Sequence, residues 1–306
     1  MRIFTIGETT FDILFRDENP VGACSGGSAF NSAISLGRCR LPVCLISTFG
    51  NDHIGDLSMK FLTRNGVNCN LIKRFDGQSR VALAFFDSDN NADYSFYQAS
   101  KDVYPEYPEP QKNDLILLGS SFAIRDNGRE NLLGFLHLAK EAGCIIIYDP
   151  NARQSLKDKP EIVNKIQQNI TLATLVKGSD QDFRNIFGLN DAKSVFTRIS
   201  ESENKYLVYT KGADGAELFT PDFNFAVQAK ETTVISTIGA GDNFSAGIVY
   251  GLNQLVNNRS FEELAPPDWE KIMNYGILFS SEVCGSSENY LSEETAESLR
   301  SDLLLL

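Results

Sequence analysis

The sequence predicts an α/β fold of three layers, in which helices cover both faces of a mostly parallel central sheet and a small β-sheet stands apart as a lid. From residue 114 onward, short continuous apolar segments alternate with segments of helical periodicity, as in parallel sheets that are buried on both faces. Between residues 79 and 98, two alternating segments flank a cluster of turn residues, which indicates a hairpin. A chain of 306 residues suits one large domain, 1–306.

The individual elements follow from the spacing of apolar residues. Strands are expected where short apolar, β-branched or alternating runs occur, at 2–6, 11–15, 43–48, 114–118, 144–148, 174–176, 206–210 and 232–235. Helices are expected where apolar residues recur every three or four positions, at 32–37, 57–65, 130–142, 162–169 and 243–252. The segment 49–56 is expected to be a polar loop, and 22–31 to contain a glycine-rich turn. The lid would consist of about 9–22 and 78–104, with the hairpin turn at 87–91, and would exclude water from a reaction site.

Four polar clusters follow segments that we expect to be strands, at 149–153, 177–182, 210–215 and 236–242. Ligands of open parallel sheets bind beyond the carboxyl ends of the strands. Four such clusters at one edge therefore favour a binding site over four unrelated turns.

The segment 232–252 reads as a strand, a turn of small residues and a helix, with Asp242 in the first helical turn. Free backbone N–H groups and the helix dipole make such a position a seat for an anion. A carboxylate beside a phosphate is unfavourable unless it accepts a proton from a hydroxyl group that attacks phosphorus. The alternative is that Asp242 is an ordinary acidic residue at the start of a helix.

Composition excludes several classes of partner. The formal net charge of −12 argues against nucleic acid and against an anionic membrane as main partners. The sequence contains no apolar run long enough to span a bilayer and no signal-peptide pattern. Six scattered cysteines without zinc-ligand spacing are typical of reduced thiols, so we expect a cytoplasmic protein.

Taken together, the motifs resemble the ribokinase, or PfkB, family of carbohydrate kinases, and in particular its fructokinase-like members. The similarity runs nearly from end to end. Its motifs are Gly7-Glu8-x3-Asp12, Gly26-Gly27 with Asn31, Asp149-Pro150-Asn151-x-Arg153, Thr210-x-Gly212-x-x-Gly215 and Gly239-Ala240-Gly241-Asp242. The last of these is the most specific.

The resemblance implies a ribokinase-like fold, ATP and Mg²⁺ as cofactors, and a role for each matching residue. Asp242 would be the general base, and the amides of Gly239, Ala240 and Gly241 would form an anion hole for the γ-phosphoryl group. The sugar would be bound by Asp12, Gly26, Gly27, Asn31 and Arg153. The nucleotide would be bound by Ser179, Thr210, Gly212, Gly215 and Asn274. Mg²⁺ would be held through water near Asp182.

Three departures from the family pattern matter. The magnesium motif N-x-x-E is Ser179-x-x-Asp182 here. Ser236 replaces the aspartate that opens the DTxGAGD signature, which puts a monovalent-cation (K⁺) site in doubt. Gln98 stands where related ketoacid and fructose kinases carry a lid arginine, and its neutral side chain favours a neutral sugar over one with a carboxylate.

We therefore expect ATP-dependent phosphorylation of a sugar primary hydroxyl, with fructose to fructose 6-phosphate as the leading hypothesis. The alternatives are a 2-keto-3-deoxygluconate, ribose or nucleoside kinase, or a non-catalytic sugar-binding regulator on the same fold. A homodimer through the lid is a further hypothesis, since exposed sheet edges tend to pair.

Overall fold

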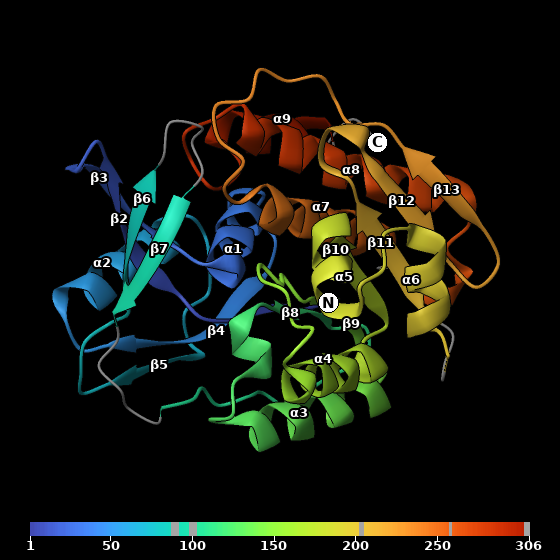
Figure 1. The fold of residues 1–306 in the computed structure, drawn as a ribbon, viewed down its shortest axis with the longest axis horizontal. Helices are drawn as coiled ribbons and strands as arrows, with labels where there is room; N and C mark the ends of the chain where they lie inside the picture. Colours follow the sequence, from blue (N-terminus) through green and yellow to red (C-terminus); the bar gives the residue numbers. More distant parts are fainter. Residues whose placement is uncertain (87–91, 98–102, 202–204, 257–258, 303–306) are drawn as a thin grey trace.

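A nine-stranded sheet forms the centre of the molecule, in the order β13-β12-β11-β10-β9-β8-β1-β4-β5 (Figure 1). The structure is a computed structural model and describes residues 1–86, 92–97, 103–201, 205–256 and 259–302. All neighbouring pairs from β5 to β11 are parallel, and β12 and β13 continue the sheet antiparallel at one edge. The strands are β1 (Ile3–Ile6), β4 (Val43–Gly50), β5 (Ile72–Phe75), β8 (Leu115–Gly119), β9 (Ile145–Asp149), β10 (Leu175–Ser179), β11 (Tyr206–Thr210), β12 (Ala216–Phe219) and β13 (Asn224–Val227).

Helices cover both faces of this sheet, so the predicted three-layer fold is confirmed. Successive strand residues face opposite sides: Ile145 and Ile147 belong to one apolar core, and Ile146 and Tyr148 belong to the other. The first core packs under α1 (Ser28–Arg38), α2 (His53–Arg64), α7 (Ala240–Leu255), α8 (Pro266–Cys284) and α9 (Glu293–Asp302). The second packs under α3 (Arg129–Glu141), α4 (Pro160–Leu172), α5 (Asp180–Phe187) and α6 (Ala192–Ile199).

A separate four-stranded sheet, the small sheet, lies beside the central one in the order β3-β2-β6-β7 (Figure 1). Its strands are β2 (Thr10–Arg16), β3 (Asn19–Gly26), β6 (Val81–Phe86) and β7 (Ala92–Tyr97). The β6–β7 hairpin is antiparallel as predicted, whereas β2 and β6 are parallel. The predicted turn at 87–91 and Gln98 lie outside the described residues. The division of the chain into a lid of 9–22 and 78–104 stays a prediction.

Two local expectations were wrong. Residues 232–235 form no strand, because their neighbours are helical: the Ile235 amide donates to the Cys284 carbonyl at the end of α8, 2.8 Å away. The segment expected to be a polar loop is divided between β4, which reaches Gly50, and α2, which begins at His53. The glycine-rich turn expected within 22–31 is at Gly27, which has a φ of +114° and separates β3 from α1, while 22–26 pair with β2 as the end of β3.

Within the described part of the chain, no helix combines the length and the apolar content needed to cross a bilayer.

Candidate active site

A cavity of about 550 Å³ opens between the small sheet and the carboxyl edge of the central sheet. Gly7 follows β1 and Asn151 follows β9 at the edge of the central sheet, and Tyr94 comes from β7 of the small sheet. Both sheets therefore contribute to the lining. The predicted residues that line it are Asp12, Gly27, Asn31, Arg153, Gly239 and Asp242. Residues that are far apart in the sequence therefore meet at the edge of the sheet where the sequence predicts a ligand.

Asp242 lies in the first turn of α7, as predicted, and its side chain is buried. The turn before it depends on Gly239, whose φ is +80° and whose added Cβ would lie 2.7 Å from the Asn289 carbonyl oxygen. Amides of a first helical turn have no acceptor one turn earlier in the helix. The Ala240 amide is an exception here, because it donates to the Thr237 carbonyl at 3.3 Å.

Asn31 and Asp12 supply polar oxygens beside Asp242. The Asn31 amide nitrogen donates to Oδ2 of Asp242 at 2.9 Å, which orients the carboxylate. Oδ1 of Asn31 and Oδ1 of Asp12 are both buried without a protein hydrogen-bond partner. The two side chains are close, because a Cβ added to Gly26 would lie 3.2 Å from Asp12 Oδ2 and 3.9 Å from Asn31 Oδ1. Buried acceptors of this kind require donors from a ligand or from water.

Burial is the main influence on the charge of Asp12. Burial raises the pKa of Asp12, and the Thr10 side chain and the Arg153 charge offset part of that rise. Arg153 is exposed on the wall of the cavity, with its guanidinium carbon 5.7 Å from the Tyr94 ring centroid. Its Nε donates to Oδ1 of Asn151 at 3.3 Å.

Sequence reasoning missed a second arginine in the cavity. Arg80, which precedes β6, pairs with Glu8 at the end of β1, and its guanidinium carbon lies 4.6 Å from the Phe96 ring centroid. The same Glu8 oxygen accepts a hydrogen bond from the Ser121 hydroxyl at 2.8 Å. This ion pair joins the small sheet to the central sheet. No sequence pattern reveals it, because the two residues belong to separate elements 72 positions apart.

Four of the five predicted nucleotide residues lie along the same edge, and all five lie outside the lining of the described cavity. Ser179 at the end of β10 pairs in register with Thr210 at the end of β11, and Gly212 and Gly215 belong to the turn that follows β11. Asn274 is exposed on α8. The structure thus groups the two strand ends with their turn, and it leaves Asn274 on a separate helix.

Both carboxylate oxygens of Asp182, the predicted magnesium residue, already accept hydrogen bonds from protein groups. Its Oδ2 accepts from the amide and the hydroxyl of Ser179, both at 2.7 Å, and its Oδ1 accepts from the Ala152 amide at 2.7 Å. The described residues contain no cluster of three or more His, Cys, Asp or Glu side chains that could hold a metal directly. The donor set therefore fits Mg²⁺ only through water or through ligand phosphates, as Mg²⁺ commonly binds.

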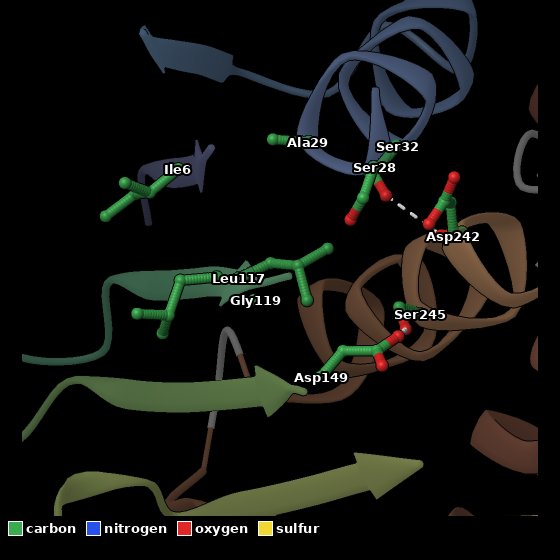
Figure 2. A pocket seen from close by; sticks show the side chains of 10 residues that line it. Ile6, Ser28, Ala29, Ser32, Leu117, Gly119, Asp149, Asp242 and Ser245 are labelled. Atoms are coloured by element: carbon green, nitrogen blue, oxygen red, sulfur yellow. Dashed lines mark hydrogen bonds between the residues drawn. The ribbon is translucent and has the colours of Figure 1, made fainter. Parts of the chain in front are cut away.

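Asp242 also lines a smaller cavity of about 10 Å³, and Figure 2 shows the side chains around it. Asp149 and Ser245 line it with Asp242, and the Ser245 hydroxyl donates to Asp149 Oδ2 at 3.0 Å. The same oxygen accepts from Nζ of Lys177 at 2.8 Å. Sequence reasoning also missed this buried pair, although a lysine inside the apolar strand segment 175–179 was a signal that it has a partner.

Comparison with known proteins finds relatives that match most of the chain. A fructokinase of Rhizobium leguminosarum bv. trifolii is 29% identical over 286 residues, which are 89% of this chain and 86% of that protein. A Vibrio cholerae O395 fructokinase solved with fructose, ADP and a calcium ion superposes with a TM-score of 0.82 at 21% identity, covering 97% of this chain and 98% of that one. Aminoimidazole riboside kinase of Salmonella enterica, solved with aminoimidazole riboside and an ATP analogue, gives a TM-score of 0.80 at 19% identity, with 98% and 100% covered.

These structural neighbours establish the ribokinase-like fold. The profile of the pfkB family carbohydrate kinases matches residues 2–295, almost the whole chain. The chain therefore belongs to the pfkB family of carbohydrate kinases and is a sugar kinase, a phosphotransferase that acts on an alcohol group.

Proposed function

We propose that this kinase transfers the γ-phosphoryl group of ATP to a primary hydroxyl of a neutral sugar, with fructose as the first candidate and its 6-hydroxyl as the acceptor. The observation that carries the proposal is the pair of unpartnered oxygens, Asp12 Oδ1 and Asn31 Oδ1, next to the carboxylate of Asp242. Sugar hydroxyls are donors that would satisfy both acceptors. Such bonding would hold the reacting hydroxyl near the base.

Asp242 would act as the general base on this hydroxyl. Asn31 holds one carboxylate oxygen through its amide, which leaves the other oxygen of Asp242 to receive the proton. The first turn of α7 would bind the negative charge of the transferred group through its amides, which point along the helix axis toward the phosphoryl group. In this proposal Gly241 contributes most directly, because the Ala240 amide is turned toward Thr237.

ATP would bind at the ends of β10 and β11, beside Ser179 and Thr210, with its γ-phosphate toward α7. Mg²⁺, when bound, would neutralise charge on the phosphates. Asp182 would orient its water ligands, while the hydrogen bonds to Ser179 and Ala152 fix the carboxylate. A monovalent cation has less support, because Ser236 brings no charge and its hydroxyl oxygen accepts from the Ile238 amide at 3.2 Å.

Two features favour a neutral sugar. Both arginines of the cavity already have partners: Arg80 pairs with Glu8, and Arg153 donates to Asn151 Oδ1 at 3.3 Å. A substrate carboxylate would have to displace one of these partners. The name of the Rhizobium relative is consistent with fructose.

The test is ADP release with purified protein and a panel of fructose, ribose, 2-keto-3-deoxygluconate and a nucleoside. We expect the highest kcat/KM with fructose. Asp242→Asn should lower kcat by about 10²- to 10⁴-fold while ATP binding persists. Asp222→Asn, at an exposed position in the turn between β12 and β13, is the matched control and should leave kcat unchanged. Full turnover by Asp242→Asn would refute the mechanism, and sugar binding without ADP release would instead identify a non-catalytic regulator.

A further inference from the structure

Lys177 is a charged side chain in the interior of the molecule. It belongs to β10 and lies close to the first turn of α7, where the proposed transfer takes place. It is 3% exposed, and its ammonium group lies 2.8 Å from Asp149 Oδ2. The register of β9 and β10, with Val176 opposite Tyr148, brings the two residues together. Burial lowers the pKa of Lys177, but the charges of Asp149 and then of Asp182 outweigh burial, so the net shift is upward and the ammonium keeps its proton.

The ammonium group also lies close to Gly241, which precedes the base in the first turn of α7. A Cβ added to Gly241 would lie 3.2 Å from Nζ of Lys177, so the lysine packs against the backbone at that residue. Asp149 accepts a second hydrogen bond from Ser245, one turn further along α7. Lys177, Asp149 and Ser245 therefore connect β10 and β9 to the first two turns of α7.

Figure 2 shows where Asp149 and Ser245 lie relative to Asp242. Asp149 and Asp242 line the same small cavity, and Ser32 donates from α1 to the Asp242 backbone carbonyl at 2.9 Å. The Asp242 charge in turn acts on Lys177. Lys177 does not line the large cavity of the described structure, so it has no direct route to a sugar there.

We infer that Lys177 is a positioning residue for phosphoryl transfer: it holds the start of α7 through Asp149 and Ser245 and places a fixed positive charge behind the Gly241 amide. Negative charge that develops on the transferred phosphoryl group would be attracted by this ammonium group, with the first turn of α7 between them. Its field acts without reorganisation, because the ion pair is already formed. The inference rests on the proposed function, since it assumes transfer at the N-terminus of α7.

Removal of the lysine alone would combine two effects. Lys177→Met leaves the Asp149 carboxylate buried without its cation, which destabilises proteins strongly. The double variant Asp149→Asn/Lys177→Met removes both charges and keeps an acceptor for Ser245. If Lys177 only stabilises the fold, the double variant should recover both thermal stability and kcat.

The experiment compares these two variants with wild type and with Lys205→Met. Lys205 is a matched control because it is also buried and its ammonium group binds the carbonyls of Thr171 and Ala173, away from α7. We expect the double variant to regain most of the melting temperature lost by Lys177→Met. Its kcat should stay about tenfold to a hundredfold below wild type, with the KM of the sugar within about twofold.

Lys205→Met should lower the melting temperature and leave kcat within about twofold. Recovery of kcat together with stability in the double variant would overturn the inference. So would a loss confined to KM, an equal loss of kcat in Lys205→Met, or failure of the double variant to fold. Wild-type turnover on the sugar panel tests the proposed function by itself, and the ratio of variant to wild-type kcat tests Lys177.

Discussion

Asn31 offers a sharp test of the proposed base, because a nearly isosteric change reverses its effect on Asp242. In Asn31→Asp, a donor 2.9 Å from Asp242 Oδ2 becomes a second carboxylate in a buried position. At about 4 Å and an effective dielectric constant of about 20, two unit charges repel by about 4 kcal/mol. One pH unit corresponds to about 1.4 kcal/mol. With some screening by cavity water, the two carboxylates should therefore lose their last shared proton at a pH about 2 to 3 units higher.

The measurement is the pH dependence of kcat/KM for the preferred sugar, from about pH 5.5 to about pH 9.5. In Asn31→Asp the acidic limb should move to higher pH, so that activity is low near neutrality and recovers in alkaline buffer. Asn31→Ala is the uncharged control: it should lower kcat/KM by about tenfold to a hundredfold through the lost hydrogen bonds, without moving the limb. An unshifted limb in an active, folded Asn31→Asp variant would show that Asp242 does not accept the proton.

Three further predictions concern the turn, the helix next to the small sheet and cation dependence. Gly239→Ala should lower kcat by at least about 10²-fold, because the added Cβ would collide with a backbone oxygen at a positive φ and displace the proposed anion hole; unchanged kcat would argue against that hole. Asp52→Ala should cost about 1 to 3 kcal/mol of unfolding free energy in chemical denaturation, since Asp52 caps α2 and accepts from both the amide and the hydroxyl of Ser79. Burial raises the pKa of Asp52, but these hydrogen bonds outweigh burial and the net shift is downward. The stabilisation is therefore fully present above the unfolded pKa of about 3.9 and is lost as pH falls through the folded value, so Asp52→Ala and wild type should converge in stability at strongly acid pH. Replacing K⁺ by tetramethylammonium should change kcat by less than about twofold, because Ser236 brings no charge and the Asn243 amide already holds the carbonyl of Gly239 at 2.8 Å; strong activation by K⁺ would contradict this.

The sequence was most informative where one local rule decides the structure. The runs at 43–48 and 206–210 are strands because parallel strands buried on both faces need continuous apolar residues. The run at 232–235 satisfies the same propensity and still forms no strand, since its backbone pairs with the end of α8 instead of a neighbouring strand. The antiparallel edge, β12 and β13, also escaped prediction, because four-residue strands carry too little periodicity to distinguish them from loops.

Among the site residues, those with a local signature were predictable and those fixed by tertiary pairing were not. Motif spacing identified Asp12, Asn31 and Asp242, which the fold brings to one cavity. The Glu8–Arg80 ion pair depends on how the small sheet docks on the central one, and nothing in either segment specifies that docking. The homodimer through the lid stays a prediction; Phe96 and Tyr97, both exposed on the edge strand β7, are the residues that such contact would cover first.

The acidic net charge of −12 raises the question of how this chain would bind ATP. Fields at a site are local, since charges beyond about 8 Å in solvent are largely screened at physiological salt. In the large cavity, Arg80 is engaged by Glu8 and so gives little net attraction for phosphate. At the other end, the first turn of α7 presents positive potential through its amides, and Lys177, although paired with Asp149, has its ammonium group close to Gly241. The proposed direction of transfer, from nucleotide across α7 to sugar, therefore passes a helix N-terminus whose positive potential does not depend on exposed side chains.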